Sequence, residues 1–187
     1  MEEQPNLVSG QILLRPYRPD DAADLYAAAR ESIAEVSLWM KWCHPDYTIE
    51  ESRIWTTQCV GRWREGTEYN FVIADSRDAS FLGGCGLNNV NLLDKVANLG
   101  YWVRTSQTRQ GIATTATRLL ARFGLEELRL NRIEIIAATG NGASQRVADK
   151  AGAAREGVLR NRLVVHENVY DMVIYSFVPH DLKRLLD

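Results

Sequence analysis

Runs of apolar residues with two different spacings divide the chain into strands and helices. Alternating or continuous apolar segments, typical of β-strands, lie at 12–15, 69–74, 81–90, 132–138, 159–165, 169–177 and in a stretch that ends at Arg104. Apolar spacings of three and four predict helices that begin near Asp20 or Asp21, after Thr48, after Gly111 and after Asn141. Asp20 or Asp21 can cap the first helix, Thr48 and Glu51 form a capping-box pattern for the second, and Gly66 and Gly152 end the second and the fourth. Residues 1–10 carry neither pattern, and we expect them to be frayed.

The order of these elements predicts an α/β (α+β) fold. We expect a single domain over residues 1–187, with a mixed central sheet of about seven strands flanked by about four helices. Short turns join the strands that precede Arg104, which favours antiparallel pairing. The helix after Gly111 is a crossover connection and predicts one parallel pair. Gly83, Gly84 and Gly86 lack the spacing of a dinucleotide-binding loop, so they indicate a bulge or a close backbone approach.

A strand, a glycine turn and a helix follow one another around Gly111. Apolar residues at 99, 101 and 103 alternate with polar or small ones, and the helix after the turn has one apolar face. Free backbone N–H groups at such a turn, together with the helix dipole, favour a bound anion such as phosphate. Arg109 could add a charged contact. An ordinary strand-to-helix turn that contains a glycine explains the same residues.

Two further segments have both a structural and a functional interpretation. Trp39 and Trp42 lie in an irregular aromatic stretch and are either core residues or one wall of an acceptor pocket. Asn141 and Ser144 begin a helix, which suits capping by Asn141, and this role is compatible with a second one at a ligand.

Composition narrows the class of protein. Charged residues make up 25% of the chain and the formal net charge is -2, so no overall field attracts nucleic acid. No apolar run reaches the roughly 20 residues that span a bilayer, and the first residues do not resemble a signal peptide. Three widely spaced cysteines suggest buried thiols in a reducing cytoplasm rather than disulfides or a zinc site. We therefore expect a cytoplasmic protein without metal, membrane or nucleic-acid partners.

Five motifs, in order along the chain, carry a resemblance to a known family. Thr108-Arg109-Gln110-Gly111-Ile112-Ala113 resembles the Gln/Arg-x-x-Gly-x-Gly/Ala acyl-CoA loop of the GNAT acetyltransferases. Asn141-x-x-Ser144, continued by Val147-Ala148-x-Lys150-x-Gly152, is similar to the second signature of the RimJ/RimL-type branch. Further matches to that branch are Trp39-Met-Lys-Trp42, Gly100-Tyr101-Trp102, and Glu156-Gly157 with Tyr170-Asp171. The resemblance extends from about Leu13 to Phe177.

The resemblance implies transfer of an acetyl group from acetyl-CoA to a primary amine. The cofactor pyrophosphate would bind the amides from Thr108 to Ala113. The amide-rich pantetheine arm would pair with the edge of Tyr101-Trp102-Val103, which requires this strand to splay from its neighbour. By the same resemblance Ser144 is a candidate general acid for the departing thiolate, and Asn141 would fix the pantetheine or the loop.

Two departures from the branch pattern stand out. Thr108 replaces the usual Gln or Arg, which weakens one expected phosphate contact. Ala153 or Ala154 replaces a usual Phe, which we interpret as a change in packing.

The sequence shows no strong general base. Glu134 is a weak candidate, and Asp94, His166 and Glu167 fit solvated loop charge. An α-amine has a pKa of about 7.7–8.0 and a lysine amine about 10.4, so at pH 7.5 roughly a third of the former but only ~0.1% of the latter is neutral. A missing base therefore favours an α-amine acceptor, held by Trp39 and Trp42.

Three interpretations stay open at this stage. The first is an acetyltransferase that acts on the N-terminal α-amine of a protein or peptide, as known members of the branch do. The second is the same chemistry on a small amine such as an antibiotic, polyamine or amino acid. The third is a non-catalytic acyl-CoA-binding module. A homodimer is also compatible with the sequence.

Overall fold

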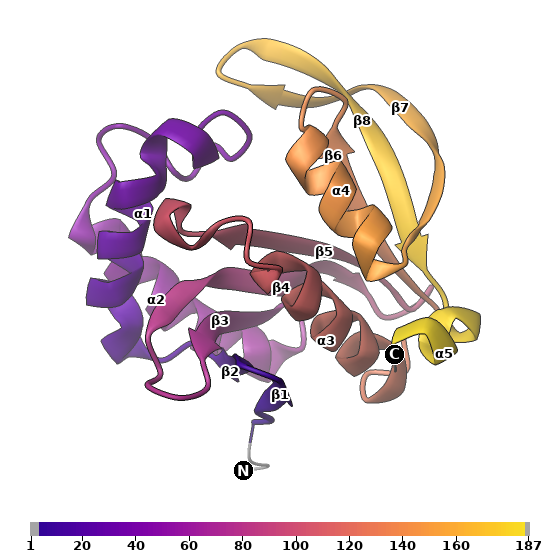
Figure 1. Ribbon diagram of the computed structural model, residues 1–187, viewed down its shortest axis with the longest axis horizontal. Coiled ribbons are helices and arrows are strands. Elements are labelled where there is room, and N and C mark those ends of the chain that lie inside the picture. Colours follow the sequence, from indigo (N-terminus) through magenta and orange to yellow (C-terminus); the bar gives the residue numbers. More distant parts are fainter. Residues whose placement is uncertain (1–3, 186–187) are drawn as a thin grey trace.

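The structure of the protein is a computed structural model that describes residues 4–185 (Figure 1). Eight strands form one sheet in the order β1-β2-β3-β4-β5-β6-β8-β7. The strands are β1 (Leu7–Ser9), β2 (Ile12–Pro16), β3 (Tyr69–Asp75), β4 (Phe81–Asn91), β5 (Val96–Val103), β6 (Arg132–Ala138), β7 (Ala154–Val165) and β8 (Asn168–Phe177). The helices are α1 (Ala22–Val36), α2 (Ile49–Glu65), α3 (Ile112–Glu126), α4 (Gly142–Ala151) and α5 (Leu182–Leu185).

The predicted strand pairing is confirmed. Strands β1 to β5 are antiparallel neighbours, and the α3 crossover makes β5 and β6 the one parallel pair of the sheet between residues 4 and 185. The structure adds two elements to those expected, namely β1 and the short helix α5. The expectation of frayed residues 1–10 was wrong for Leu7–Ser9, which pair with β2, while residues 1–3 lie outside the described part.

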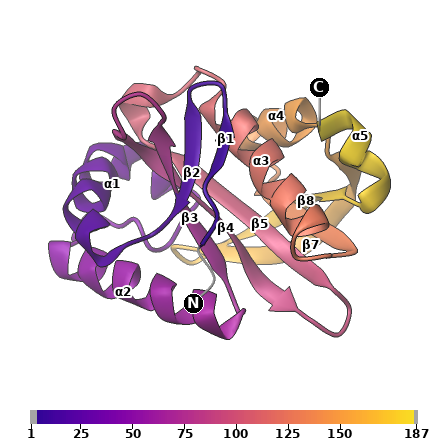
Figure 2. The ribbon, with the colours of Figure 1, turned by 90° about the horizontal axis from the view of Figure 1, so that it is seen from below.

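Helices cover both faces of the sheet. Helices α1 and α2 lie on one face, and α3 and α4 lie on the other (Figure 2). The main core is between the sheet and α3, where Leu120, Phe71 and Ile133 are fully buried. Strand β5 shows the predicted alternation, because Leu99 packs toward α3 while Trp102 packs on the side of α1 and α2. Ala153, at one of the two departures from the branch pattern, packs against the main core.

Local signals fix the ends of most helices. Thr48 and Glu51 form the predicted capping box at α2, and Gly66 ends this helix in the left-handed region with a φ of 68°. Asn141 caps α4 and Gly152 ends it. At α1 the capping prediction was wrong, because the Asp21 carboxylate forms no cap bond to that helix. It accepts bonds from Arg15 and from the backbone N–H of Arg18 instead.

The glycines of β4 mark close approaches, as predicted. A Cβ atom at Gly84 would lie 2.5 Å from the Tyr17 hydroxyl, and one at Gly86 would lie 2.2 Å from Oδ1 of Asn70. The register of β3 and β4 also shifts beside Gly83. Because these glycines have no side chains, polar groups can lie flat against the strand on the α2 side.

Strands β5 and β6 separate after a short paired stretch. Their pairing runs only from Val96–Arg132 to Asn98–Glu134. Beyond that point β6 pairs with β8 on its other side, and β5 keeps its pairing with β4. Among the described residues, the edge of β5 from Leu99 to Val103 therefore has no strand partner, which is the splay that the resemblance required. We call the position of the Asn98–Glu134 pair the strand fork.

Candidate active site

The loop before α3 presents a row of free backbone donors. No acceptor lies within hydrogen-bonding distance of the N–H groups of residues 109–114 in the part of the chain from residue 4 to residue 185. Gly111 has a φ of 80°, and a Cβ atom added to it would meet nothing within 4 Å. Arg109 is also left-handed, with a φ of 64°. Consecutive free amides at a helix N-terminus fit a phosphate group.

The C-terminal half of α1 holds the stem of this loop. Glu31 pairs with the Arg104 guanidinium and accepts a bond from the N–H of Ser106 at 2.8 Å. These bonds lower the pKa of Glu31 to about 2, so the carboxylate stays charged at neutral pH. Ser32 accepts a bond from the N–H of Thr105 at 3.0 Å. The loop is thus anchored before it reaches Gly111.

Within the loop, two side chains predicted to contact the cofactor make internal bonds. The Thr108 hydroxyl donates to the carbonyl of Thr105 at 3.0 Å, and the Gln110 amide donates to Gln107 at 3.2 Å. Ile112 is buried, whereas Arg109 is exposed beside the free amides. Any loss of a phosphate contact at Thr108 leaves the backbone donors in place.

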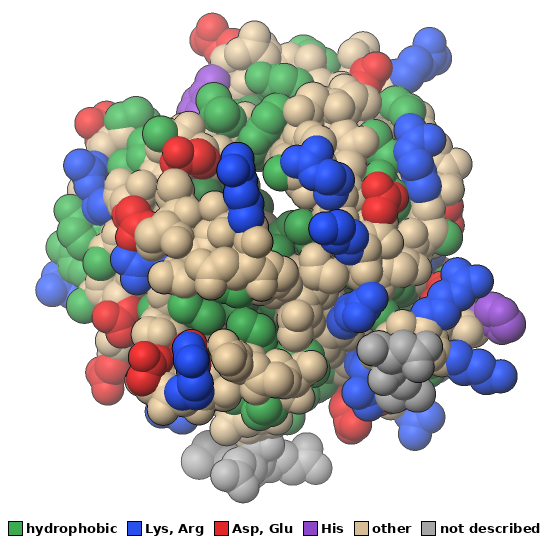
Figure 3. Space-filling model, viewed as in Figure 1, with side chains coloured by type: hydrophobic (Ala, Val, Ile, Leu, Met, Phe, Trp, Pro, Cys, Tyr) green, Lys and Arg blue, Asp and Glu red, His purple; other side chains and the backbone are tan. Residues whose placement is uncertain are grey.

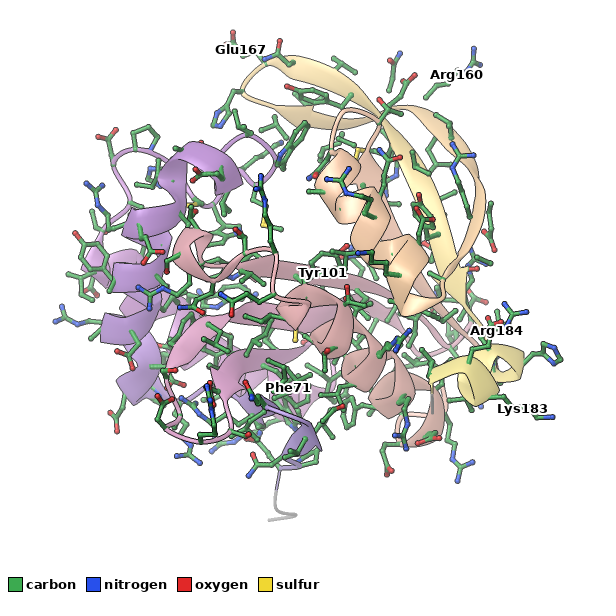
Figure 4. The ribbon with its side chains drawn as sticks, viewed as in Figure 1. Phe71, Tyr101, Arg160, Glu167, Lys183 and Arg184 are labelled. Atoms are coloured by element: carbon green, nitrogen blue, oxygen red, sulfur yellow. The ribbon has the colours of Figure 1, made fainter. Side chains whose placement is uncertain are left out.

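Helix α4 and strand β5 meet across the splay through one pair of hydroxyls. The Tyr101 phenol donates to the carbonyl of Ser144 at 3.0 Å, and Oγ of Ser144 lies 3.0 Å from the same phenol oxygen. Asn141 accepts a bond from the N–H of Ser144 at 3.0 Å, which confirms its capping role. Burial raises the pKa of Tyr101 to about 12, so this phenol stays protonated. Figure 4 shows Tyr101 between β5 and α4.

A pocket of about 850 Å³ lies on the other face of β5, between the strand fork, α2 and the segment that precedes α2. The molecule has two halves, one built on β1 to β5 and the other on β6 to β8. The space-filling view shows a hollow where these halves meet, with Lys and Arg side chains beside the opening (Figure 3). Aromatic side chains form much of the pocket wall, and they are Tyr17, Trp42, Tyr47, Trp55, Tyr101 and Trp102. The centre of the Trp42 ring system lies 5.2 Å from that of Trp102 and 5.7 Å from the ring centre of Tyr47. A volume of this size holds a small ligand or the first residues of a peptide.

Apart from tyrosines and a cysteine, few ionisable side chains line this pocket. Within residues 4–185 they are Lys41, His44 and Glu51. The Glu51 carboxylate accepts bonds from Nε2 of His44 and from the backbone and side chain of Thr48, each 2.8 Å long. Bonds from Thr48 and His44 lower the pKa of Glu51, which makes it a poor proton acceptor.

Sequence reasoning did not place His44 and Glu51 in the site. The signals were present, because His44 is two residues from Trp42 and Glu51 belongs to the capping box. That capping role gave no reason to expect a pocket residue.

The two tryptophans predicted at the acceptor occupy different places. Trp42 lines the pocket, but Trp39 does not. The Trp39 ring lies 6.1 Å from Tyr170, and its edge would be 3.4 Å from a Cβ atom at Gly140. His166, at the turn between β7 and β8, bonds the carbonyl of Ser37 at 3.0 Å. Trp39 and this turn thus join the two halves of the molecule beyond the splay.

Glu134, the candidate base, lies at the strand fork opposite Asn98. Its carboxylate accepts a bond from Arg132 at 2.7 Å, and Arg132 also pairs with Glu156. Glu134 does not line the pocket, whereas Ile136 on the same face of β6 does. An ion pair of this kind holds the Glu134 side chain along its own strand.

An open strand edge beside a loop of free backbone donors fits the arm and the phosphates of an acyl-CoA, and comparisons with known proteins point to the same class of ligand. A profile of the acetyltransferase (GNAT) domain matches residues 11–154. A putative ribosomal N-acetyltransferase, YdaF of Bacillus subtilis, is 29% identical over 93% of this chain and 94% of its own. RimJ of Mycobacterium smegmatis, solved with CoA-disulfide, is 27% identical with a TM-score of 0.84, over 96% of this chain and 88% of that one.

A third relative shows the fold alone. The microcin C7 self-immunity acetyltransferase MccE, solved with acetyl-CoA and AMP, is 23% identical with a TM-score of 0.85, over 91% of this chain and 93% of that chain. Taken together, these matches show that the chain belongs to the GNAT acetyltransferases and is similar to their RimJ/RimL-type members. It is an acetyl-CoA-dependent N-acetyltransferase.

No helix between residues 4 and 185 has the length and apolar character of a membrane-spanning segment. No group of three or more His, Cys, Asp or Glu in that range is placed to hold a metal ion.

Proposed function

We propose that this enzyme acetylates the N-terminal α-amine of a protein or peptide. The observation that carries the proposal is the composition of the acceptor pocket. Its wall is aromatic, and its one carboxylate among residues 4–185, Glu51, is held by three hydrogen bonds. A site without a free carboxylate suits an amine that is already neutral in part at pH 7.5, and an α-amine fits this condition far better than lysine.

Each residue group has a role in the proposed reaction. The free amides of residues 109–114 would hold the pyrophosphate of acetyl-CoA, and the open edge of β5 would hold the pantetheine arm. The acceptor would enter along Trp42 and Trp102 and reach the splay from the opposite face of the sheet. The neutral amine attacks the thioester carbonyl and forms the new C–N bond. The C–S bond then breaks, and the departing thiolate takes a proton from Ser144, which regains one from solvent. Tyr101 would keep the Ser144 hydroxyl in position.

Glu134 is our candidate for accepting the proton that the amine loses after attack, because it lies at the strand fork. Its bond to Arg132 would have to loosen for this role.

A small amine is the second candidate acceptor. The specific observation in its favour is the pocket volume of about 850 Å³ combined with aromatic rings at several sides. MccE, a relative of the same fold, was solved with AMP beside acetyl-CoA. A flat ring on a small amine could stack in such a pocket.

The test is a CoA-release assay with matched acceptors. One acceptor is a peptide with a free N-terminus, and its control is the same peptide with a blocked N-terminus. The other acceptors are a polyamine, an amino acid and an aminoglycoside. We expect turnover with the free peptide alone. Rapid turnover of a small amine and none of the peptide would replace this proposal by the second candidate.

A variant checks the pocket in the same assay. Trp42 is partly exposed and contacts the rings of Trp102 and Tyr47. We expect Trp42→Ala to raise KM for the peptide about tenfold, and KM for acetyl-CoA to stay the same, because truncating an aromatic anchor typically costs more than 1 kcal/mol. Equal changes in both constants would argue that Trp42 acts on the fold instead.

A further inference from the structure

Two asparagines face each other at the strand fork, on the pocket side of the sheet. Asn88 of β4 pairs in register with Asn98 of β5, and both line the pocket. Nδ2 of Asn98 donates to Oδ1 of Asn88 at 3.0 Å. Asn98 is also the last residue of β5 that pairs with β6, opposite Glu134. The amide pair therefore sits at the inner end of the splay.

Hydrogen bonding within this pair is incomplete. Oδ1 of Asn98 is buried and has no donor within residues 4–185. Oδ1 of Asn88 accepts one bond and has a second lone pair to offer. A buried acceptor without a donor is unfavourable, so the free protein carries an unfavourable group at this position. A turn of the Asn98 carboxamide about its terminal torsion, which is a soft one, breaks its bond to Asn88 and presents the oxygens of both residues to a ligand with N–H donors.

The fork is also where the reacting atoms would meet. With the phosphates of acetyl-CoA bound at Gly111, the pantetheine arm would run back along the open edge of β5. From Val103 to Leu99 it would pass five residues, about 16 Å of strand. The far end of that arm then lies next to Asn98. Gly100 has no side chain there, and a Cβ atom at this position would lie 3.6 Å from Nδ2 of Asn88. The space between the arm and the amide pair is thus left open.

From this arrangement we infer that Asn88 and Asn98 bind the nitrogen of the acceptor amine through their carboxamide oxygens. The inference rests on the proposed function and adds the contact that orients the attacking group. A neutral oxygen accepts an N–H bond without the charge that would stabilise an ammonium ion. A carboxylate at the same place would raise the pKa of the amine and reduce its reactive fraction. An amide pair therefore matches an amine that must be neutral to react.

Other ionisable groups near the proposed amine position can also contribute to the pH profile of the reaction. They are Lys41, His44 and Glu51 from the segments before and within α2, and Glu134 across the fork on β6. Tyr17 and Cys85 line the same pocket, and burial raises the pKa of both far above neutral pH. The same groups are present in the wild type and in the variant, so a difference between their pH profiles reports the added carboxylate.

Three variants test the inference with the amine that the wild-type enzyme acetylates. Asn98→Leu and Asn88→Leu should each raise KM for the amine about tenfold and leave KM for acetyl-CoA unchanged. Asn98→Asp should shift the midpoint of the pH profile of kcat/KM upward by about one pH unit, because the carboxylate stabilises the ammonium form. A control, Asn168→Leu, replaces an exposed asparagine of β8 and should change neither constant nor the profile.

Thermal unfolding separates a structural role from a binding one. Asn98→Leu removes the unsatisfied acceptor, so its Tm should equal or exceed that of the wild type while the KM for the amine rises. A normal KM and an unshifted pH midpoint in the three variants would overturn the inference and leave the proposed function intact. Absence of turnover by the wild type with any amine would overturn the proposed function, and this inference with it.

Discussion

Replacement of Gly111 by glutamate should weaken acetyl-CoA binding at least tenfold. A carboxylate ~6 Å from the pyrophosphate repels each of its two charges by about 0.7 kcal/mol in fully solvated surroundings, or about 1.4 kcal/mol in total. This energy is a factor of about ten in Kd, and shielding from solvent would increase it. The side chain itself has room, because nothing lies within 4 Å of its Cβ position. The loss of affinity would therefore come from repulsion of the ligand, because the glutamate meets no clash within the protein.

Backbone strain has to be separated from this effect. Gly111 has a φ of 80°, so any side chain costs about 1–2 kcal/mol of stability there. Gly111→Ala carries the same strain without charge, and Gly111→Gln adds the bulk of glutamate without charge. We expect all three variants to lose a similar amount of Tm.

Isothermal titration calorimetry with acetyl-CoA, at low and at moderate salt, measures the remaining difference. Affinity should fall in the order Ala, Gln, Glu, and the gap between Gln and Glu should narrow as salt rises. Equal affinities of the Ala and Glu variants for acetyl-CoA at low salt would show that the phosphates do not bind at this loop.

Two further predictions concern the splay and the stem of the loop. In steady-state assays Ser144→Ala should lower kcat by a factor of about 10²–10⁴ with little change in KM for acetyl-CoA, as loss of a general acid does. A lower Tm with a normal kcat would show that Ser144 has a purely structural role. The pKa of Glu31 falls to about 2 in the folded protein from an ordinary value of 4.5, so its stabilising effect is complete above about pH 4.5 and is lost as pH falls toward 2. The difference in Tm between wild type and Glu31→Gln should therefore shrink on acidification, and a constant difference from pH 7 to pH 3 would contradict this reasoning.

Sequence reasoning predicted those features of the fold that depend on local signals. The helix ends at Thr48, Gly66 and Gly152 follow from capping chemistry, and the structure has each of them. The parallel pair followed from the helical crossover after Gly111. Residues 7–9 were missed because a three-residue strand has too little periodicity to be detected, and it forms only because β2 offers an edge.

The pocket beside the strand fork could not be predicted in the same way. Its wall joins residues far apart in sequence, such as Trp42, Asn98 and Ile136, and only the tertiary arrangement brings them together. Asp21 shows the same limit at small scale, because its carboxylate is taken by Arg15, six residues earlier on β2, rather than by the α1 N-terminus. Competition among partners of that kind is not visible in the sequence pattern.

The most direct measurement uses one peptide that carries both a free N-terminal α-amine and an internal lysine. The peptide is treated with enzyme and acetyl-CoA over a range of pH and then sequenced by tandem mass spectrometry. The proposed function predicts acetylation of the α-amine alone, with kcat/KM rising with pH and levelling off near the α-amine pKa of about 7.7–8.0. Acetyl on the lysine with none on the α-amine would contradict it.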